Sequence, residues 1–129
     1  MNNRLHNCTN PHQGVTKKVL CVCSAGLLRS PTAAVVLNRE YDYNTRACGV
    51  DKGHALIPID DVLCEWADEI VVMEKWMADY VDQGFQNKVK VLGVPDRFAY
   101  MDPLLQKAIL DAYKLQTMIT EVLHEDTVS

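Results

Sequence analysis

The chain has 129 residues, of which 48% are hydrophobic, and its formal net charge is −4 at pH 7. This length and hydrophobic content fit one domain with one core. The net charge is slightly negative, so the sequence does not indicate a broad basic surface. We therefore expect neither nucleic acid nor an anionic membrane as the main partner. No apolar run is long enough to cross a bilayer. An anionic substrate would therefore have to be bound by a local group of residues and not by the charge of the whole protein.

Residues 1–16 are polar and show no hydrophobic periodicity, which predicts a flexible tail ahead of a single domain over residues 17–129. The tail lacks the apolar segment of a secretory signal. The five cysteines form an odd set without framework spacing, which favours reduced thiols and a cytoplasmic location. Cys21 and Cys23 form a C-x-C pair with no second ligand pair nearby, so we expect no metal site.

Short apolar, β-branched runs alternate with helical patterns along the chain. The runs predict strands over residues 17–23, 45–50, 69–73 and 88–94. Helices are predicted from residue 30 onward, over 60–66, over 74–85 and over 104–123. This alternation indicates an α/β fold with a parallel sheet covered on both faces. Ligands bind beyond the carboxyl ends of such strands, so the loops after Cys23, Met73 and Val94 should share one functional edge.

The loop after the first strand carries the pattern C-x5-R-S, from Cys23 to Ser30. Five intervening residues let the backbone curl so that successive N–H groups point inward and form an anion-binding nest. The helix that begins here adds the positive end of its dipole. The residues expected to bind phosphate through this nest are Ser24, Ala25, Gly26, Leu27 and Leu28.

Three side chains of this loop carry the predicted chemistry. Arg29 offers a planar fork that matches two phosphate oxygens, which a lysine does not. Cys23 faces the same donors, which favour its thiolate form and make it a nucleophile. The hydroxyl of Ser30 can donate to that thiolate and later help it leave. A bare C-x5-R occurs often by chance, but its position between an apolar strand and a helix with an early proline favours a functional site.

The segment VLCVCSAGLLRSPTAA resembles the phosphate-binding loop of the low-molecular-weight protein tyrosine phosphatases, whose usual pattern is C-x-G-N-x-C-R-S-P. Cys23, Arg29, Ser30 and Pro31 match that pattern by position. Residues 46–50, 72–74 and 94–100 resemble the family's second strand, third strand and acid loop. The likeness covers most of residues 17–124, although only the first motif is highly specific.

This resemblance implies a flavodoxin-like three-layer sandwich with a four-stranded parallel sheet in the order 2-1-3-4. It implies no cofactor, and hydrolysis of phosphomonoesters through a cysteinyl-phosphate intermediate. The implied substrate is a protein carrying phosphotyrosine or a small aryl phosphate. The chain departs from the pattern at Gly26, where the family has Asn, and at Leu28, where it has a second cysteine. The stretch 51–68 is shorter and lacks the aromatic residue that usually walls the substrate cleft.

A general acid is needed to protonate the leaving oxygen, and two aspartates compete for this role. Asp96 follows the fourth strand immediately, which places it on the functional edge. Asp102 precedes Pro103 as in the family signature, but a helix cap explains it fully. We therefore favour Asp96. Phe98 and Tyr100 are expected either to line the cleft against an aryl substrate or to pack against the last helix.

The remaining charges after the third strand, those of Glu74, Lys75, Asp79 and Asp82, are interpreted as the solvated face of a helix. Glu74 stays the next candidate for the acid if neither aspartate serves.

Three other functions remain open at this point. A phosphocarrier domain of the sugar-phosphotransferase type has a cysteine in the same place but does not need Arg29. An arsenate reductase on this fold would need relay cysteines after the third strand, where Cys48 and Cys64 do not lie. A non-catalytic anion-binding regulator would not need the complete set of Cys23, Arg29 and Ser30.

Overall fold

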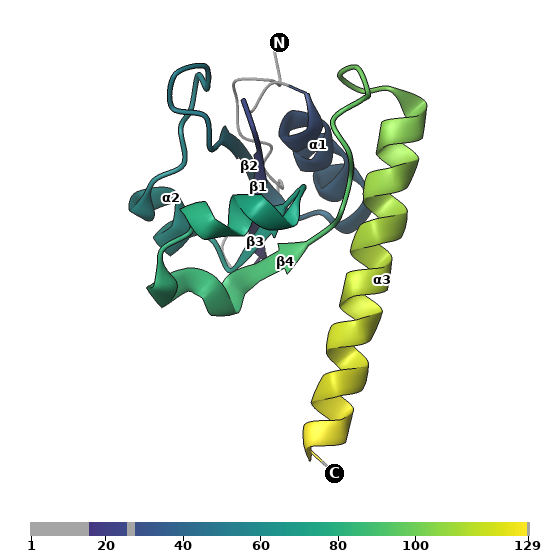
Figure 1. Cartoon of the computed structure of the whole chain (residues 1–129). Helices are drawn as coiled ribbons and strands as arrows, with labels where there is room; N and C mark the ends of the chain where they lie inside the picture. The colour runs from purple at the N-terminus through teal and green to yellow at the C-terminus, as the bar shows by residue number, and fades with distance from the viewer. Residues whose placement is uncertain (1–15, 26–27, 129) are drawn as a thin grey trace.

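A computed structural model describes residues 16–25 and 28–128, and their side chains as far as residue 120 (Figure 1). The elements follow in the order β1 (Lys18–Cys23), α1 (Arg29–Tyr41), β2 (Asn44–Gly49), α2 (Asp61–Trp66), β3 (Glu69–Val72), η1 (Lys75–Tyr80), η2 (Gln83–Lys88), β4 (Val89–Val91) and α3 (Pro103–Val128), η marking 3-10 helix. The N-terminal tail predicted over residues 1–16 lies outside the described residues except for Thr16. Within the described chain, no helix is long and apolar enough to span a membrane.

The strands form one parallel sheet in the order β2-β1-β3-β4, which confirms the predicted topology. β1 lies in the middle and is buried from Val19 to Cys23, as the run VLCVC indicated. In register, Cys23 at the end of β1 lies beside Gly49 at the end of β2. The end of β1 therefore has a hydrogen-bonded strand on each side.

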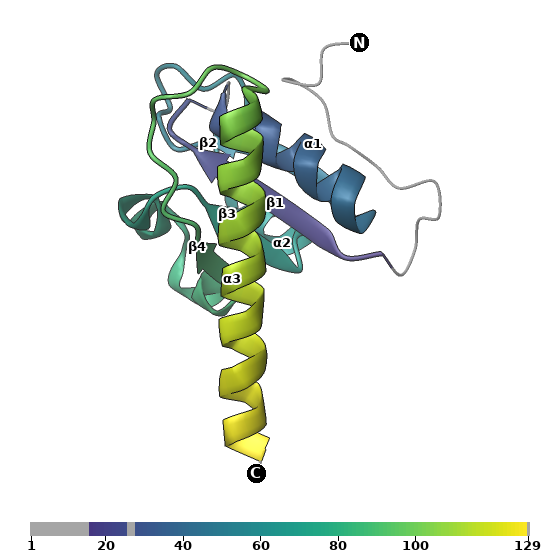
Figure 2. The ribbon, with the colours of Figure 1, turned by 90° about the vertical axis from the view of Figure 1, so that its right-hand side faces the viewer.

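Helices cover both faces of the sheet (Figures 1 and 2). α1 and α3 pack together on one face, and α2 with the two 3-10 segments lies on the other. α1 buries Ala33, Val36 and Leu37, the face that its sequence pattern predicts. α3 buries Leu105 and Ile109, and its C-terminal half extends past the sheet (Figure 2).

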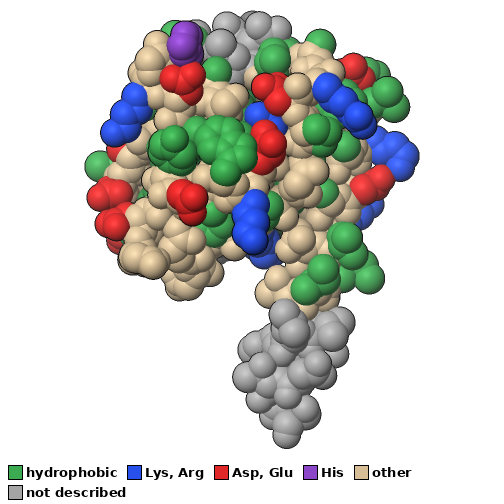
Figure 3. All heavy atoms as spheres, viewed as in Figure 1, with side chains coloured by type: hydrophobic (Ala, Val, Ile, Leu, Met, Phe, Trp, Pro, Cys, Tyr) green, Lys and Arg blue, Asp and Glu red, His purple; other side chains and the backbone are tan. Residues whose placement is uncertain are grey.

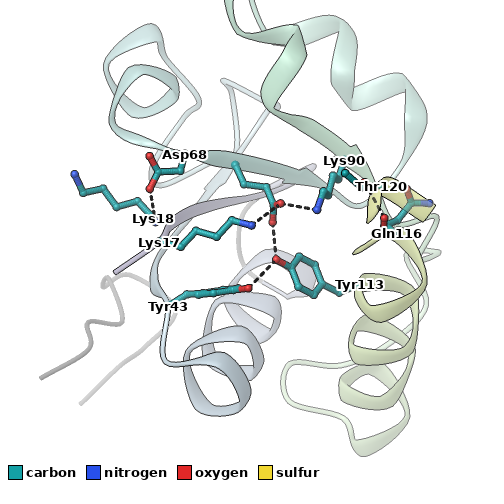
Figure 4. A network of polar contacts seen from close by, with 9 residues as sticks. Lys17, Lys18, Tyr43, Asp68, Lys90, Tyr113, Gln116 and Thr120 are labelled. Atoms are coloured by element: carbon teal, nitrogen blue, oxygen red, sulfur yellow. Dashed lines mark hydrogen bonds and ion pairs between the residues drawn. The ribbon is translucent and has the colours of Figure 1, made fainter. Parts of the chain in front are cut away.

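A buried polar network joins the strands at the end opposite Cys23 (Figure 4). The Glu69 carboxylate, at the start of β3, lies 3.0 Å from Lys17 Nζ and 2.7 Å from Lys90 Nζ. It also accepts a hydrogen bond of 2.8 Å from the Tyr113 hydroxyl of α3. Three sheet segments and one helix therefore meet at a single carboxylate.

The helix predicted over residues 74–85 is wrong. Two 3-10 segments replace it, separated by Val81 in an extended conformation (φ −95°, ψ 125°). Asp82 begins the second segment by accepting a hydrogen bond from the Gln83 N–H at 2.9 Å. Val81 is buried, so the chain turns it inward and interrupts the helix.

The fourth strand is shorter than predicted, because β4 covers only Val89–Val91 rather than residues 88–94. Its extension still hydrogen-bonds to the neighbouring strand, since Leu92 N–H donates to Val72 O at 3.0 Å and Val94 N–H donates to Met73 O at 2.8 Å. Gly93 between them has a φ of 74°, a conformation that glycine adopts without steric cost. The kink ends the regular strand and directs the chain toward Asp96.

Candidate active site

The carboxyl ends of the strands meet at one edge, as expected for a parallel sheet. Backbone hydrogen bonds tie the loops there together: Val50 N–H donates to Cys23 O at 3.0 Å and Asp51 N–H donates to Ser24 O at 2.8 Å. On the other side of β1, Met73 N–H donates to Val22 O at 3.0 Å. The segment after Cys23 is thus flanked by the loops that follow β2 and β3.

The thiol of Cys23 contacts the hydroxyl of Ser30 in the buried floor of this edge, with 3.1 Å between Sγ and Oγ. The same hydroxyl lies 3.1 Å from the carbonyl oxygen of Cys48 and can donate to it. A hydroxyl has one proton, so it serves one acceptor at a time. With Cys23 as a thiol it can donate to the carbonyl, and with Cys23 as a thiolate it can rotate to donate to sulfur. Ser30 is therefore placed to stabilise the nucleophilic form.

Arg29 is buried at the first position of α1, with 1% of its surface exposed. Its Nη1 donates to Glu74 Oε2 at 2.6 Å and to the carbonyl of Val94 at 2.8 Å. These two bonds use both protons of Nη1. Nε lies 3.8 Å from Asp96 Oδ1. Glu74 and Val94 therefore fix the guanidinium from one side, and the Nε–Nη2 edge is the pair of donors suited to two oxygens of an anion.

The N-terminus of α1 is not capped by a side chain. Leu28 occupies the cap position with no side-chain hydrogen bond, and the first turn contains no acidic residue. The first-turn N–H groups of Arg29 and Ser30 lack acceptors within the helix, and Pro31 has no N–H. An uncapped helix start beside a buried arginine is suited to bind an anion.

Two further cysteines, Cys48 and Cys64, have surroundings that favour the neutral thiol. Burial raises the pKa of Cys48 well above its ordinary value, and neighbouring thiols and Asp60 add to the effect. Burial, with Asp61 close by, raises the pKa of Cys64 to about 11. Both remain protonated at neutral pH and are poor nucleophiles.

The sequence matches no family model and no curated protein. Solved structures are similar over almost their whole length. The tyrosine phosphatase Wzb from Escherichia coli K30, solved with phosphate, is 17% identical, with a TM-score of 0.63 over 78% of this chain and 95% of that one. The YwlE arginine phosphatase from Geobacillus stearothermophilus is 18% identical, with a TM-score of 0.57 over 87% and 96%. A low-molecular-weight phosphotyrosine phosphatase from Vibrio cholerae O395 is 19% identical, with a TM-score of 0.56 over 85% and 98%.

The chain has the fold of the low-molecular-weight protein tyrosine phosphatases. This agrees with the resemblance carried by its first motif. At these identities the comparison concerns the fold, and the assignment of individual residues depends on the geometry of the site.

The structure places the predicted loop residues as follows. Ser24 and Ala25 are half-buried directly after β1, and Leu28 is exposed directly before α1. Gly26 and Leu27 lie outside the described residues. The described residues at both ends of the predicted loop therefore lie at the carboxyl edge of the sheet.

The two candidate acids lie in different surroundings. The Asp96 carboxylate is 55% exposed and lies beside the guanidinium of Arg29. Asp102 accepts a hydrogen bond of 2.8 Å from the Leu104 N–H at the start of α3, as a helix cap does. This contact supports the structural explanation of Asp102 and leaves Asp96 as the aspartate beside the anion-binding group.

The two aromatic residues of the loop that contains Asp96 differ in their surroundings. Phe98 is partly buried and packs against the core, with the guanidinium of Arg97 5.3 Å from its ring centre. Tyr100 is half-buried. Neither is among the described residues that line the hollow beside Ser24.

Two features of this edge were not predicted from the sequence: the contact of Glu74, until then only the next candidate for the acid, with Arg29, and the aromatic lining from η1. Glu74 is not on a solvated helix face, because it precedes η1 and bonds to Arg29 with 34% of its side chain exposed. Its place directly after β3 was the available signal, since the same edge rule pointed to Asp96. Trp76 and Tyr80 of η1 were also overlooked, and they line the hollow beside Ser24.

A larger hollow of about 610 Å³ shares Tyr80 with this one but has a different character. Its lining includes the carboxylates of Asp61, Asp79 and Asp82, which repel a phosphate group. Among the described residues, no group of three or more His, Cys, Asp or Glu side chains is placed to hold a metal ion. The edge at Cys23 is therefore the better site for a phosphorylated ligand.

Proposed function

We propose that this chain is a cysteine-dependent phosphomonoester hydrolase with Cys23 as its nucleophile. The observation that carries the proposal is the contact of 3.1 Å between Cys23 Sγ and Ser30 Oγ beside the buried Arg29, at the carboxyl end of the central strand. Nucleophile, hydroxyl donor and anion-binding group thus come from one strand–loop–helix unit. The fold neighbours act on tyrosine or arginine phosphates, as their names state, which supports the same class of reaction here.

The proposed reaction has two steps. The Cys23 thiolate attacks phosphorus, the bond from phosphorus to the ester oxygen breaks, and Asp96 gives its proton to the departing oxygen. Water then attacks the cysteinyl phosphate, Asp96 takes its proton, and the thiolate leaves with a hydrogen bond from Ser30. Arg29 and the loop N–H groups stabilise the charge on the equatorial oxygens in both steps.

The buried position of Arg29 favours hydrolysis over phosphate carrying. Taking a guanidinium out of water is costly, and here Glu74 and Val94 hold it in one orientation. A phosphocarrier, which passes its phosphate on, does not need such a clamp. The substrate we propose is a phosphorylated protein or a small aryl phosphate. The thiols of Cys48 and Cys64 form no disulfide, which supports the proposal of a reducing, cytoplasmic compartment.

Hydrolysis of nitrophenyl phosphate by the wild type, Cys23→Ser and Cys64→Ala tests this function. Cys64 is a buried cysteine of α2 that does not belong to the proposed loop, and it serves as the cysteine control. We expect Cys23→Ser to lose activity by a factor of at least ~10³, while Cys64→Ala keeps most of it. A Cys23→Ser variant that is folded by circular dichroism and as active as Cys64→Ala would refute the proposed nucleophile.

A further inference from the structure

A hollow of about 420 Å³ opens beside the proposed nucleophile. Its walls come from the loops after β1, β2 and β3, and the residues are Ser24, Val50, Asp51, Lys52, Trp76 and Tyr80. Ser24 directly follows Cys23, and its carbonyl accepts the hydrogen bond from Asp51 N–H. The hollow is therefore continuous with the loop that would hold the phosphate.

The two aromatic side chains of this hollow are not needed by the hydrophobic core. Trp76 is 46% exposed and Tyr80 is 52% exposed, whereas Met77 between them is the residue of η1 that is buried. Their rings meet edge to face, with centroids 6.0 Å apart and planes at 77°. Figure 3 shows hydrophobic side chains gathered near the middle of this face, next to acidic ones. An apolar part of a ligand that covers these exposed rings would bury apolar surface, which favours binding.

We propose that Trp76 and Tyr80 form the binding site for the aromatic ring of an aryl phosphate, with Trp76 as the main determinant of substrate specificity. This proposal deepens the proposed function and rests on it. An ester bound with its phosphorus at Cys23 has its leaving group at Ser24, because that residue borders both the loop and the hollow. Val50 and the two rings then offer an apolar wall to the leaving group, and Lys52 and Asp51 stay at its rim.

The proposed ring site provides an aromatic wall for the substrate cleft, which the sequence did not locate. The aromatic residue of the stretch 51–68, Trp66, packs against the core with the guanidinium of Arg46 4.2 Å from its ring centre. Phe98 likewise packs against the core, next to Arg97. Trp76 comes from a different element, the 3-10 segment after β3. That segment reaches the site because β3 neighbours β1 directly. The ring site is thus supplied from the side of the sheet where a long helix was expected.

Binding of two ligands separates the ring site from the phosphate site. Inorganic phosphate has no ring, whereas phenylphosphonate carries one on a non-hydrolysable bond to phosphorus. Calorimetric titration with each ligand compares the wild type with Trp76→Ala, Trp76→Phe and Leu115→Ala. Leu115 is a similarly exposed apolar residue (55%) on α3, on the opposite face of the sheet from η1, and serves as the control.

We expect Trp76→Ala to weaken phenylphosphonate binding about tenfold and to leave phosphate binding unchanged. Trp76→Phe should retain most of the phenylphosphonate affinity, and Leu115→Ala all of it. Equal loss for both ligands would show that Trp76 only maintains the loop, and no loss for either would show that the ring lies elsewhere, so each result overturns the proposal. If the wild type binds both ligands as expected but hydrolyses no aryl ester, the ring site stands and the proposed catalysis fails.

Discussion

Arg29 is the residue whose surroundings constrain the chemistry most. Burying a guanidinium is unfavourable unless its protons are bonded. Glu74 and Val94 satisfy Nη1, and the backbone of α1 holds the side chain from its first turn. Nε and Nη2 remain as a planar pair of donors, and Nε lies 3.8 Å from the Asp96 carboxylate. A lysine placed there would keep the charge but present a single ammonium group.

We therefore expect Arg29→Lys to reduce kcat for nitrophenyl phosphate by at least about 100-fold. Arg39→Lys is the matched control, because Arg39 lies on the same helix with about half of its side chain exposed. Steady-state kinetics of both variants provide the measurement. An Arg29→Lys enzyme of near-normal rate would favour the phosphocarrier interpretation.

The two aspartates can be separated with leaving groups. A general acid matters most when the departing oxygen is a poor leaving group, which needs its proton in the transition state. Asp96→Asn should lose far more activity on phenyl phosphate than on nitrophenyl phosphate. Its stability should change little, since the carboxylate is more than half exposed.

Asp102→Ala gives the opposite expectation. Losing the hydrogen bond to the Leu104 N–H should cost about 1 kcal/mol of unfolding free energy, with equal effects on both substrates. Urea unfolding measures the first effect and the ratio of the two rates measures the second. Leaving-group sensitivity in the Asp102 variant alone would exchange the two roles, and sensitivity in neither variant would direct attention to Glu74.

Among the elements, those with strong local signals were predictable from the sequence. β1 is a continuous buried run, α1 begins with an early proline, and α3 follows a cap at Asp102. The loop proposed to carry the nucleophile was recognisable because it lies between two such elements. These signals depend on neighbours in sequence, so they need no knowledge of the packing.

The segment after β3 was not predictable in the same way. Its apolar residues Trp76, Met77 and Tyr80 have helical spacing, but two of the three face the solvent-filled hollow. The turn at Val81 and the start of η2 at Asp82 depend on where Val81 can be buried. Glu74 contacts Arg29 because Glu74 follows β3, and β3 lies next to β1, the strand that precedes Arg29. Both the break at Val81 and the position of Glu74 depend on tertiary packing, which cannot be read from the local sequence pattern.

The network around Glu69 ties elements together at the other end of the sheet. Burial alone would raise the pKa of Glu69, but hydrogen bonds from Lys90, Tyr113 and Lys17 outweigh it and hold that pKa below its ordinary value of 4.5. A carboxyl with a lowered pKa stabilises the fold fully above its unfolded pKa, and the contribution is lost as pH falls through the folded pKa. The network should therefore weaken in acid, below about pH 4.5.

Glu69→Gln should reduce the unfolding free energy at pH 7 by roughly 3 kcal/mol, because it leaves two lysines without their partner. The difference from the wild type should shrink over about two pH units, as the pH is lowered from about 5 toward 3. Tyr113→Phe keeps the ring and loses one hydrogen bond, for a smaller cost of about 1 kcal/mol. Urea unfolding across this pH range tests the network. A difference independent of pH would mean that Glu69 acts by packing and not by its charge.

In the molecule as a whole, the stabilising network and the proposed active site lie at opposite ends of the sheet. The amino ends of the strands carry the Glu69 network, which stabilises the fold, and the carboxyl ends carry Cys23, Arg29, Glu74 and Asp96. The strand order β2-β1-β3-β4 puts β1, which ends at Cys23, between two others. Loops from both neighbours can therefore reach it, one with Val50 and the other with Glu74 and Trp76.

The central claim is that phosphate passes through Cys23. Rapid acid quenching of the Asp96→Asn variant during turnover of nitrophenyl phosphate, followed by peptide mass spectrometry, tests it most directly. That variant should still form the intermediate with this good leaving group and should break it down more slowly, since Asp96 is the proposed base for water. The account predicts one added phosphoryl group on the peptide that contains Cys23, absent after Cys23→Ser. Phosphate on a different residue, or turnover that persists in folded Cys23→Ser, would contradict it.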